Sequence, residues 1–307
     1  MDERAVATLR ARHEVLHDPQ LVDDAARLAR EAAACEALVV RNRTQVRGAL
    51  LQSLLGGGRI KVIGRLGVGL DNIDVAACAA AGLPVIPATG ANALSVAEYV
   101  IGAAMLLLRG AYRSTAEVAA GQWPRNALSG GREIAGKSLG LVGFGSIGQL
   151  TARLARGVGM RVIAFDAMMD EDHPAFAATG VRCAGLDEVI ATSDVVSLHV
   201  PLVDSTRGLL GAHRLHSMKP GAVLINTARG GIVDEPALAT ALKSGRLGGA
   251  AIDVFAAEPL PAAPHFEGCP NLVLTPHIAG VTAEANERVS FYIAEKVAAV
   301  LAAAGAK

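Results

Sequence analysis

Three charged side chains follow apolar runs of the kind that form buried parallel strands: Arg229, Glu258 and His277. In an open α/β sheet, ligands bind outside the carboxyl ends of the strands, so these side chains should reach one ligand site. A guanidinium can hold a carboxylate in a two-point fork, and an imidazole can give or take a proton. A carboxylate beside the imidazole would fix its orientation. The trio suits hydride transfer between a nicotinamide and a 2-hydroxy acid.

A glycine-rich turn, Gly143-Phe-Gly145-Ser-Ile-Gly148, is the strongest local signal for a cofactor. It follows an apolar run and opens a helical one, the context that is typical of dinucleotide-binding turns. The first glycine permits a tight turn, the second lets the backbone approach a pyrophosphate, and the third allows close packing of the helix on the strand. The N–H groups at the helix start, those of Ser146 and Ile147, would face the anion.

Asp166 ends the next apolar run, where an acidic residue accepts hydrogen bonds from the adenosine ribose. Asp170, Glu171 and Asp172 follow with no Arg or Lys among them, so a 2′-phosphate would be repelled. We therefore predict NAD rather than NADP as the cofactor. The alternative, a turn that binds another mononucleotide or no ligand, requires strand, turn, helix, strand and acid to align by chance.

The composition limits the function classes. The chain has 307 residues, of which 51% are hydrophobic and only 3% aromatic, which is typical of a globular α/β protein of two domains. Basic and acidic residues number 29 each, so no net positive field is available to hold nucleic acid or an anionic membrane. We expect neither as a partner.

The cysteines and the apolar segments favour a cytoplasmic protein. The four cysteines are scattered, and the N-terminus lacks the apolar region of a secretory signal. The most apolar stretch, 95–108, is too short to span a membrane and contains Glu98. His213 and His216 have a spacing seen in metal sites, but no third ligand is near, so we expect no metal.

Two series of apolar runs alternate with helical stretches. The first covers residues 14–87, and the second and stronger one covers 137–280. Residues 94–120 between them predict a long helix, with soft breaks at Gly102 and Gly110, where the chain crosses between domains. The second series predicts six parallel strands in a doubly wound sheet, at 139–142, 161–165, 195–198, 222–225, 249–254 and 272–274.

Taken together, these motifs resemble those of the D-isomer-specific 2-hydroxyacid dehydrogenases. The resemblance implies two doubly wound parallel-sheet domains of the α/β class. One is a flavodoxin-like substrate domain, residues 1–93 plus 284–307, and the other a Rossmann NAD-binding domain, residues 94–283. It also implies a homodimer through residues 94–126. The segments that carry the resemblance are 64–74, 88–98, 143–148, 198–201, 225–231, 253–259 and 275–277.

The resemblance also assigns roles to single residues. Arg229, Glu258 and His277 become the catalytic trio, and Asp253 a contact to the nicotinamide carboxamide. The segment from His199 to Pro201 would line the adenosine side. Besides the glycine turn and Asp166, the expected cofactor residues are thus His199, Pro201, Thr227 and Asp253. The expected backbone cradle for the substrate carboxylate is Leu66, Gly67, Val68 and Gly69.

Arg41 and Arg65 are candidates for substrate selection. They are similar in position to residues of the phosphoglycerate and sulfolactate dehydrogenase branches, whose substrates carry a second strong anion. Lactate or glycerate would leave such cations unpaired, and their desolvation would be costly. The alternative is that both side chains are simply solvated.

One feature departs from the family. A short apolar strand usually precedes the first helix and lies centrally in the first sheet, whereas here the predicted helix begins at once, at Met1-Asp2-Glu3. This leaves the packing of residues 1–20 open. Other functions also remain open: an NAD-sensing protein resembling the corepressors of this family, and a dehydrogenase of phosphite or of a small 2-hydroxy acid.

Overall fold

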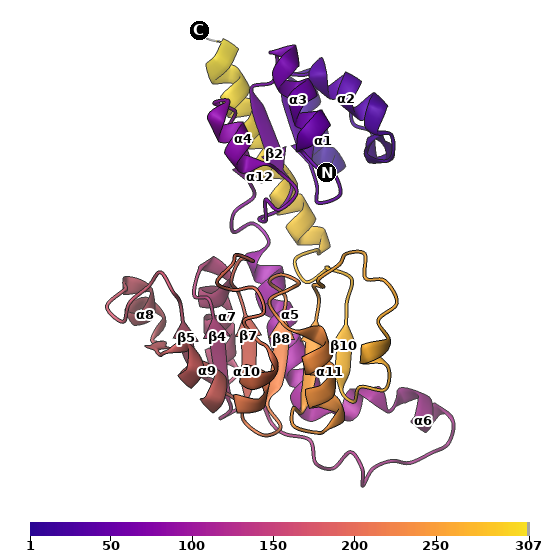
Figure 1. Ribbon diagram of the computed structural model, residues 1–307, viewed down its shortest axis with the longest axis vertical. Helices are drawn as coiled ribbons and strands as arrows, with labels where there is room; N and C mark the ends of the chain where they lie inside the picture. The colour runs from indigo at the N-terminus through magenta and orange to yellow at the C-terminus, as the bar shows by residue number, and fades with distance from the viewer. Residues whose placement is uncertain (306–307) are drawn as a thin grey trace. The chain divides into compact units, whose positions relative to one another are not determined.

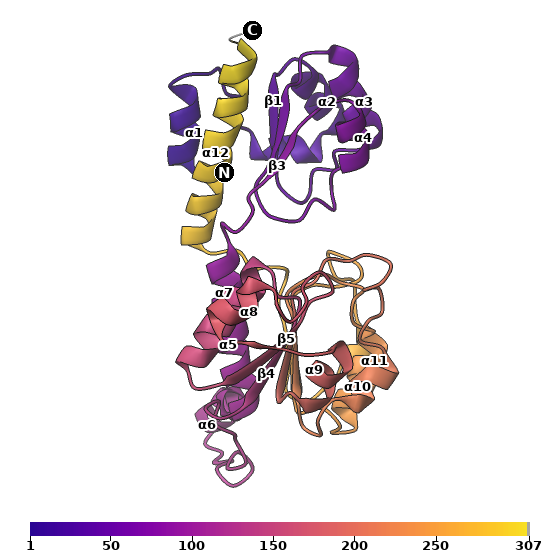
Figure 2. The same ribbon diagram turned by 90° about the vertical axis from the view of Figure 1, so that its left-hand side faces the viewer.

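The computed structural model describes residues 1–305 and divides the chain into two compact units. Unit 1 comprises Met1–Asn92 and Val281–Lys307, and unit 2 comprises Ala93–Gly280. The sequence predicts these domain boundaries after residues 93 and 283, and the structure has them after residues 92 and 280. Residues 306 and 307 lie outside the described part. Each unit is a parallel sheet covered by helices on both faces, which confirms the predicted α/β class (Figures 1 and 2).

Unit 1 is built on a three-stranded parallel sheet in the order β1-β2-β3. Its strands are short apolar runs, and Val62, Ile63 and Gly64 of the central strand are buried. Figure 2 shows α1 and α12 on one face and α2, α3 and α4 on the other. The strands are β1 (Ala37–Val40), β2 (Val62–Arg65) and β3 (Val85–Pro87), and the helices are α1 (Glu3–Arg10), η1 (Pro19–Asp23), α2 (Ala25–Ala33), α3 (Gly48–Gly57), α4 (Val75–Ala80) and α12 (Ala283–Gly305).

The final helix packs directly on the central strand of unit 1. A Cβ on Gly64 would lie 2.7 Å from Ile293 Cγ2 and 2.9 Å from Val297 Cγ2, so only glycine permits this approach. No strand precedes α1; this helix packs on α12 instead, with Ala5 and Leu9 in a cluster with α12. Both ends of the chain thus complete the same core.

Unit 2 contains a seven-stranded parallel sheet in the order β10-β9-β8-β7-β4-β5-β6. The chain order reverses between β4 and β7, which is where α/β sheets of this type bind ligands. All six predicted strands are present, and the two-residue β6 at the edge is an addition. The strands are β4 (Ser138–Val142), β5 (Arg161–Phe165), β6 (Arg182–Cys183), β7 (Val195–Leu198), β8 (Val223–Asn226), β9 (Gly249–Ile252) and β10 (Leu272–Leu274).

The predicted helix over 94–120 is shorter in the structure. It ends at Arg109, because Gly110 adopts the left-handed conformation with φ 67°, while Gly102 causes no break. Figure 2 shows α5, α7 and α8 on one face of the sheet and α9, α10 and α11 on the other. The helices of unit 2 are α5 (Ala93–Arg109), η2 (Ala111–Arg113), α6 (Thr115–Ala119), α7 (Ser146–Gly157), α8 (Pro174–Thr179), α9 (Leu186–Thr192), α10 (Ala212–Ser217), α11 (Glu235–Lys243) and η3 (Pro264–Phe266).

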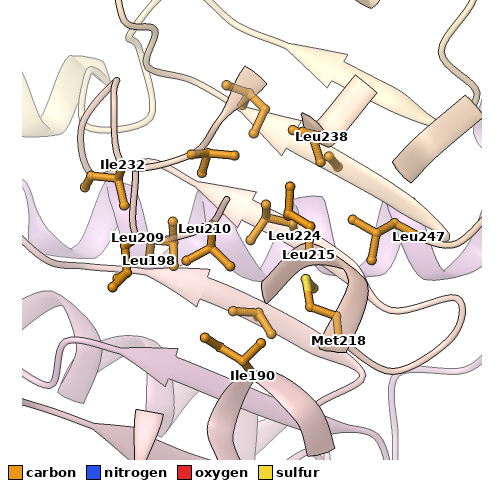
Figure 3. Close-up of a cluster of buried hydrophobic side chains, with 14 of the residues drawn as sticks. Ile190, Leu198, Leu209, Leu210, Leu215, Met218, Leu224, Ile232, Leu238 and Leu247 are labelled. Carbon is orange, nitrogen blue, oxygen red and sulfur yellow. The ribbon is translucent and has the colours of Figure 1, made fainter. Parts of the chain in front are cut away.

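The core of unit 2 holds its strand ends in place. β7 and β8 are buried along their whole length, and Leu198 and Leu224 from these strands pack with Leu215 and Met218 (Figure 3). Full burial of each such side chain stabilises the fold by about 1.5–3 kcal/mol. The loops that leave the buried strands therefore start from fixed positions.

Within residues 1–305, no helix has the length and apolar character needed to cross a bilayer.

Candidate active site

The glycine turn has a shape that fits a bound pyrophosphate. Gly143 has φ 98°, and a Cβ there would lie 2.5 Å from the carbonyl oxygen of His199. A Cβ on Gly148 would lie 2.5 Å from the Gly143 carbonyl oxygen, whereas none of the atoms around Gly145 lies within 4 Å of its Cβ position. Gly145 also precedes α7 without a side-chain cap, so the first N–H groups, including those of Ser146 and Ile147, face outward for an anion.

The Asp166 carboxylate is hydrogen-bonded to this turn. Its Oδ2 accepts a hydrogen bond from the Phe144 N–H at 2.7 Å, and its Oδ1 accepts one from the Met168 N–H at 2.9 Å. A carboxylate offers about four acceptor positions, so capacity remains for ribose hydroxyls. The residues of the turn and Asp166 therefore fit a dinucleotide.

The loop after β7 closes the other side of the turn. The His199 N–H donates to the Val142 carbonyl at 2.7 Å, and its Nε2 lies 3.0 Å from Ser197 Oγ. Burial lowers the pKa of His199 to about 4, so the imidazole is neutral at pH 7. Pro201 lies at the exposed surface, with its carbonyl accepting from Thr206 Oγ1 at 2.6 Å.

Thr227 follows the end of β8. Its hydroxyl is buried and has no hydrogen-bond partner in the described part of the chain. A buried hydroxyl of this kind retains its capacity for a ligand or an ordered water.

Two members of the predicted trio are joined directly. Glu258 Oε2 lies 2.7 Å from His277 Nδ1, and Glu258 Oε1 accepts from the Phe255 N–H at 3.0 Å. Because an ionised carboxylate only accepts hydrogen bonds, Nδ1 carries a proton in this contact, and in the neutral form of the ring Nε2 is then the nitrogen that can accept a proton. The two side chains are 39% and 32% exposed, so a small molecule can reach the ring.

The backbone that carries His277 is unusual. His277 has φ 56°, a left-handed conformation that costs a residue other than glycine on the order of 1–3 kcal/mol. Its N–H donates to the Asp253 carbonyl at 2.8 Å. The Asp253 carboxylate, which is only 1% exposed, accepts from the N–H groups of Ile278 at 2.9 Å and Ala279 at 2.8 Å. Asp253 thus holds the chain on both sides of the imidazole.

Arg229 lies on the neighbouring loop. The buried Asn226 organises this loop: its Nδ2 donates to the Arg229 carbonyl at 3.0 Å, and its Oδ1 accepts from the Ala228 N–H at 3.1 Å. A Cβ on Gly230 would lie 1.7 Å from the Phe255 carbonyl oxygen, so the loop after β8 touches the loop that bears Glu258. The structure thereby brings together the three loops that carry the trio.

Unit 1 presents its two arginines at the ends of adjacent strands. Val40 pairs in register with Arg65, and Arg41 follows Val40. Arg41 hydrogen-bonds Asn286 Oδ1 through Nη2, and burial lowers the pKa of Arg41. Both arginines are half-buried rather than fully solvated. The Arg65 Nη1 lies 1.4 Å from the position of a Cβ on Gly67, so a side chain at residue 67 would displace this guanidinium.

The backbone cradle expected in unit 1 follows β2. The N–H of Leu66 donates to the Val40 carbonyl at 2.8 Å, and the carbonyl of Gly67 accepts from the Ala88 N–H at 2.9 Å. Val68 and Gly69 are half-buried. The two ends of the segment 66–67 are thus tied into the sheet, while 68–69 remain partly accessible.

Sequence reasoning missed two residues that contact the predicted ones. Asn286 reaches Arg41 from α12, and Tyr99 reaches Thr275 from α5. Both look like ordinary polar positions on amphipathic helices, so their spacing gives no signal. Among residues 1–305, three or more His, Cys, Asp or Glu side chains nowhere gather in a way that could hold a metal ion.

Comparison with known proteins gives consistent matches. The family model described as D-isomer specific 2-hydroxyacid dehydrogenase, NAD binding domain, matches residues 101–279. An (S)-sulfolactate dehydrogenase from Chromohalobacter salexigens is 51% identical, with 97% of this chain and 94% of that protein covered. A D-3-phosphoglycerate dehydrogenase from Archaeoglobus fulgidus is 37% identical over 88% of this chain, which spans 50% of that longer protein.

A solved structure shares the fold as well. The D-lactate dehydrogenase of Aquifex aeolicus, complexed with NAD and lactic acid, superimposes with a TM-score of 0.78 at 30% identity. The match covers 90% of this chain and 85% of that structure.

Proposed function

We propose that this chain, which belongs to the D-isomer-specific 2-hydroxyacid dehydrogenase family, acts on a 2-hydroxy acid that carries a second strong anion. The chain is an NAD-dependent oxidoreductase of the CH–OH group. When bound, NAD supplies the hydride acceptor or donor of this chemistry. We further propose a role in this reaction for each residue of the candidate site.

His277 moves the proton in the proposed mechanism. With Nδ1–H bonded to Glu258, Nε2 accepts the hydroxyl proton of the 2-hydroxy acid during oxidation. The ring is then an imidazolium, which the Glu258 carboxylate stabilises until the proton leaves to solvent. In the opposite direction the imidazolium returns the proton to the 2-oxo group. The 2.7 Å contact between Glu258 and His277 is the observation that carries the assignment.

Arg229 is assigned to the substrate carboxylate. Its planar guanidinium can pair with two carboxylate oxygens and polarise the adjacent 2-oxo group. The backbone of Leu66, Gly67, Val68 and Gly69 in unit 1 is assigned to substrate binding. A neutral His199 beside the glycine turn adds no charge there that would change with pH near neutrality.

Arg41 and Arg65 are assigned to the second anion. The partial burial that lowers the pKa of Arg41 means that its charge has lost part of its hydration. A sulfonate or phosphate would offset that loss, whereas a methyl or hydroxymethyl group would not. The 51% identity to a sulfolactate dehydrogenase supports 3-sulfolactate as the first substrate to test, followed by 3-phosphoglycerate.

An NAD-coupled panel tests the proposal. It contains 3-sulfolactate, 3-phosphoglycerate, D-lactate, D-glycerate and phosphite. A charge-assisted contact is worth about 1.5–3 kcal/mol, so we expect kcat/KM to be at least about tenfold higher for a substrate with the second anion. Equal efficiency with D-lactate or D-glycerate would contradict the proposed substrate class, and activity on phosphite alone would favour the phosphite dehydrogenase alternative.

A matched pair of variants tests the role of Arg41. Arg41→Gln should lower kcat/KM for the dianionic substrate by at least about tenfold and leave D-lactate turnover unchanged. Arg43→Gln is the control, because Arg43 is 65% exposed and pairs with Asp23. Equal effects of the two changes would leave Arg41 as an ordinary surface cation.

We also propose that the protein is a cytoplasmic homodimer formed through residues 94–126. This segment exposes large apolar side chains, including Trp123 at 78%, Tyr112 at 66% and Val118 at 44%. Exposed apolar groups gathered in one segment are typical of an interaction surface. Light scattering after gel filtration should give twice the mass of the chain, and a monomer would contradict the proposed dimer.

A further inference from the structure

We propose that Tyr99 is a positioning residue for His277 and acts through Thr275 and Asp253. The inference rests on the proposed function, because it assumes that His277 moves the substrate proton. Tyr99 lies on α5, far in sequence from the trio, and none of the motifs in the sequence includes it.

Three side chains form a short hydrogen-bonded chain behind the His277 loop. Tyr99 OH lies 2.6 Å from Thr275 Oγ1, and Thr275 Oγ1 lies 2.6 Å from Asp253 Oδ1. Tyr99 and Thr275 are half-buried, and Asp253 is almost fully buried. These contacts join α5 to the ends of β9 and β10.

The number of available protons decides which group donates in each of these two hydrogen bonds. The Asp253 carboxylate only accepts, so the Thr275 hydroxyl donates its single proton to Asp253. Thr275 Oγ1 then has only lone pairs to offer, and Tyr99 must donate to it. Burial, together with the charge of Asp253, raises the pKa of Tyr99, so the phenol keeps the proton that this role needs.

Asp253 passes the constraint to His277. The same carboxylate that accepts from Thr275 also accepts from the N–H groups of Ile278 and Ala279, and the Asp253 carbonyl accepts from the His277 N–H. Three of the roughly four acceptor positions of the carboxylate are therefore used. One is left, which is compatible with the carboxamide contact expected for Asp253.

Loss of these hydrogen bonds should change the position of the His277 imidazole, not its chemical nature. If the Tyr99 hydroxyl fixes the orientation of the Thr275 hydroxyl, removal of either hydroxyl should let the Asp253 carboxylate and the left-handed loop relax. The imidazole of His277 should then shift. Small displacements of a reacting group have large effects on the chemical step. Most of the cofactor contacts that we expect lie at the glycine turn and at Asp166, away from this loop, so the KM of NAD should change much less than kcat.

Four variants test this in the full-length enzyme, with NAD and the best 2-hydroxy acid of the substrate panel. Tyr99→Phe and Thr275→Val should each lower kcat about tenfold, with the KM of NAD changed less than twofold. Thr275→Ser keeps the hydroxyl and should retain kcat within about twofold of the unchanged enzyme. The double variant Tyr99→Phe/Thr275→Val should be no slower than Thr275→Val, because both changes break one chain.

Tyr292→Phe is the matched control, since Tyr292 is also half-buried, packs in unit 1 and should tolerate the change without loss of kcat. Unchanged kcat in Tyr99→Phe, or multiplied losses in the double variant, would overturn the inference. Thermal unfolding of each variant shows whether a loss of kcat merely follows a loss of fold, and such a parallel loss, without rescue by Thr275→Ser, also counts against it.

His277→Ala separates this inference from the proposed function. If His277→Ala loses activity while Tyr99→Phe does not, only the positioning role fails. If His277→Ala remains active, the proposed proton transfer fails, whatever the result for Tyr99.

Discussion

Replacement of Gly145 by alanine should separate cofactor binding from folding. A methyl group at this position meets no protein atom within 4 Å, and the residue has φ −69° and ψ −160°, which alanine adopts without strain. The free protein should therefore fold normally. The methyl group would instead occupy the space through which a pyrophosphate approaches the start of α7.

The size of the effect can be worked out from the contacts that a phosphate would lose. A hydrogen bond to a charged group contributes about 1.5–3 kcal/mol, and each 1.4 kcal/mol is a factor of about ten in Kd. The loss of one such bond should raise the Kd of NAD roughly 10- to 100-fold. Gly148→Ala is the contrasting variant, because its methyl group would lie 2.5 Å from a backbone oxygen and should lower the free energy of unfolding by about 1–3 kcal/mol.

Isothermal titration with NAD measures the first quantity, and denaturant unfolding in the absence of NAD measures the second. We expect Gly145→Ala to change only Kd, and Gly148→Ala to change stability. Unaltered NAD affinity in Gly145→Ala would refute the assignment of this turn to the pyrophosphate. A loss of stability equal to that of Gly148→Ala would show that the space at Gly145 is not open in solution.

Three further changes have defined outcomes. Glu258→Gln should lower kcat about 100-fold and spare the Kd of NAD, because the imidazolium of His277 loses its counter-charge; steady-state kinetics with a wild-type kcat would exclude this role. Asp166→Ala should narrow the NAD over NADP preference by about tenfold in kcat/KM, and an unchanged ratio would contradict the ribose contact. His199 has a folded-state pKa of about 4 against 6.5 when exposed, so the unfolded chain binds the extra proton between these values and stability falls as the pH drops from 6.5 to 4. His199→Asn should flatten this loss, on the order of 3 kcal/mol, in unfolding curves at pH 7 and 4.5, whereas the exposed His213→Asn should not; equal slopes would argue against a buried neutral ring.

The fold could be predicted where apolar runs were long enough to show a period. The strands of unit 2 that lie in the middle of the sheet are continuous buried runs, as in β7, and their positions followed from the sequence. β6 has only two residues, Arg182 and Cys183, which is too short for any pattern. The end of α5 was misplaced because a glycine in a helical run can be either a helix residue or a left-handed cap, and Gly102 and Gly110 take these two different roles.

The sequence predicts those residues of the candidate site that are marked by their position after a strand, but not the contacts between residues far apart in the sequence. Arg229, Glu258 and His277 stand out because each follows its own strand, so their meeting at one sheet edge follows from topology. The hydrogen bond between Tyr99 and Thr275 joins residues 176 positions apart, and no local pattern encodes such a pair. The left-handed conformation of His277 was likewise invisible, because histidine is common in many backbone conformations and its φ is set by the surrounding bonds to Asp253.

The close packing of α12 on β2 has a consequence for folding during synthesis. Ile293 and Val297, which cover Gly64, lie C-terminal to unit 2 and emerge from the ribosome after it, so residues 1–92 expose one face of their sheet to water until then. Unit 2 is contiguous, and all of it precedes α12, so its core can form first. The truncated chain 1–280 should therefore contain a protease-resistant segment 93–280 and a protease-sensitive segment 1–92.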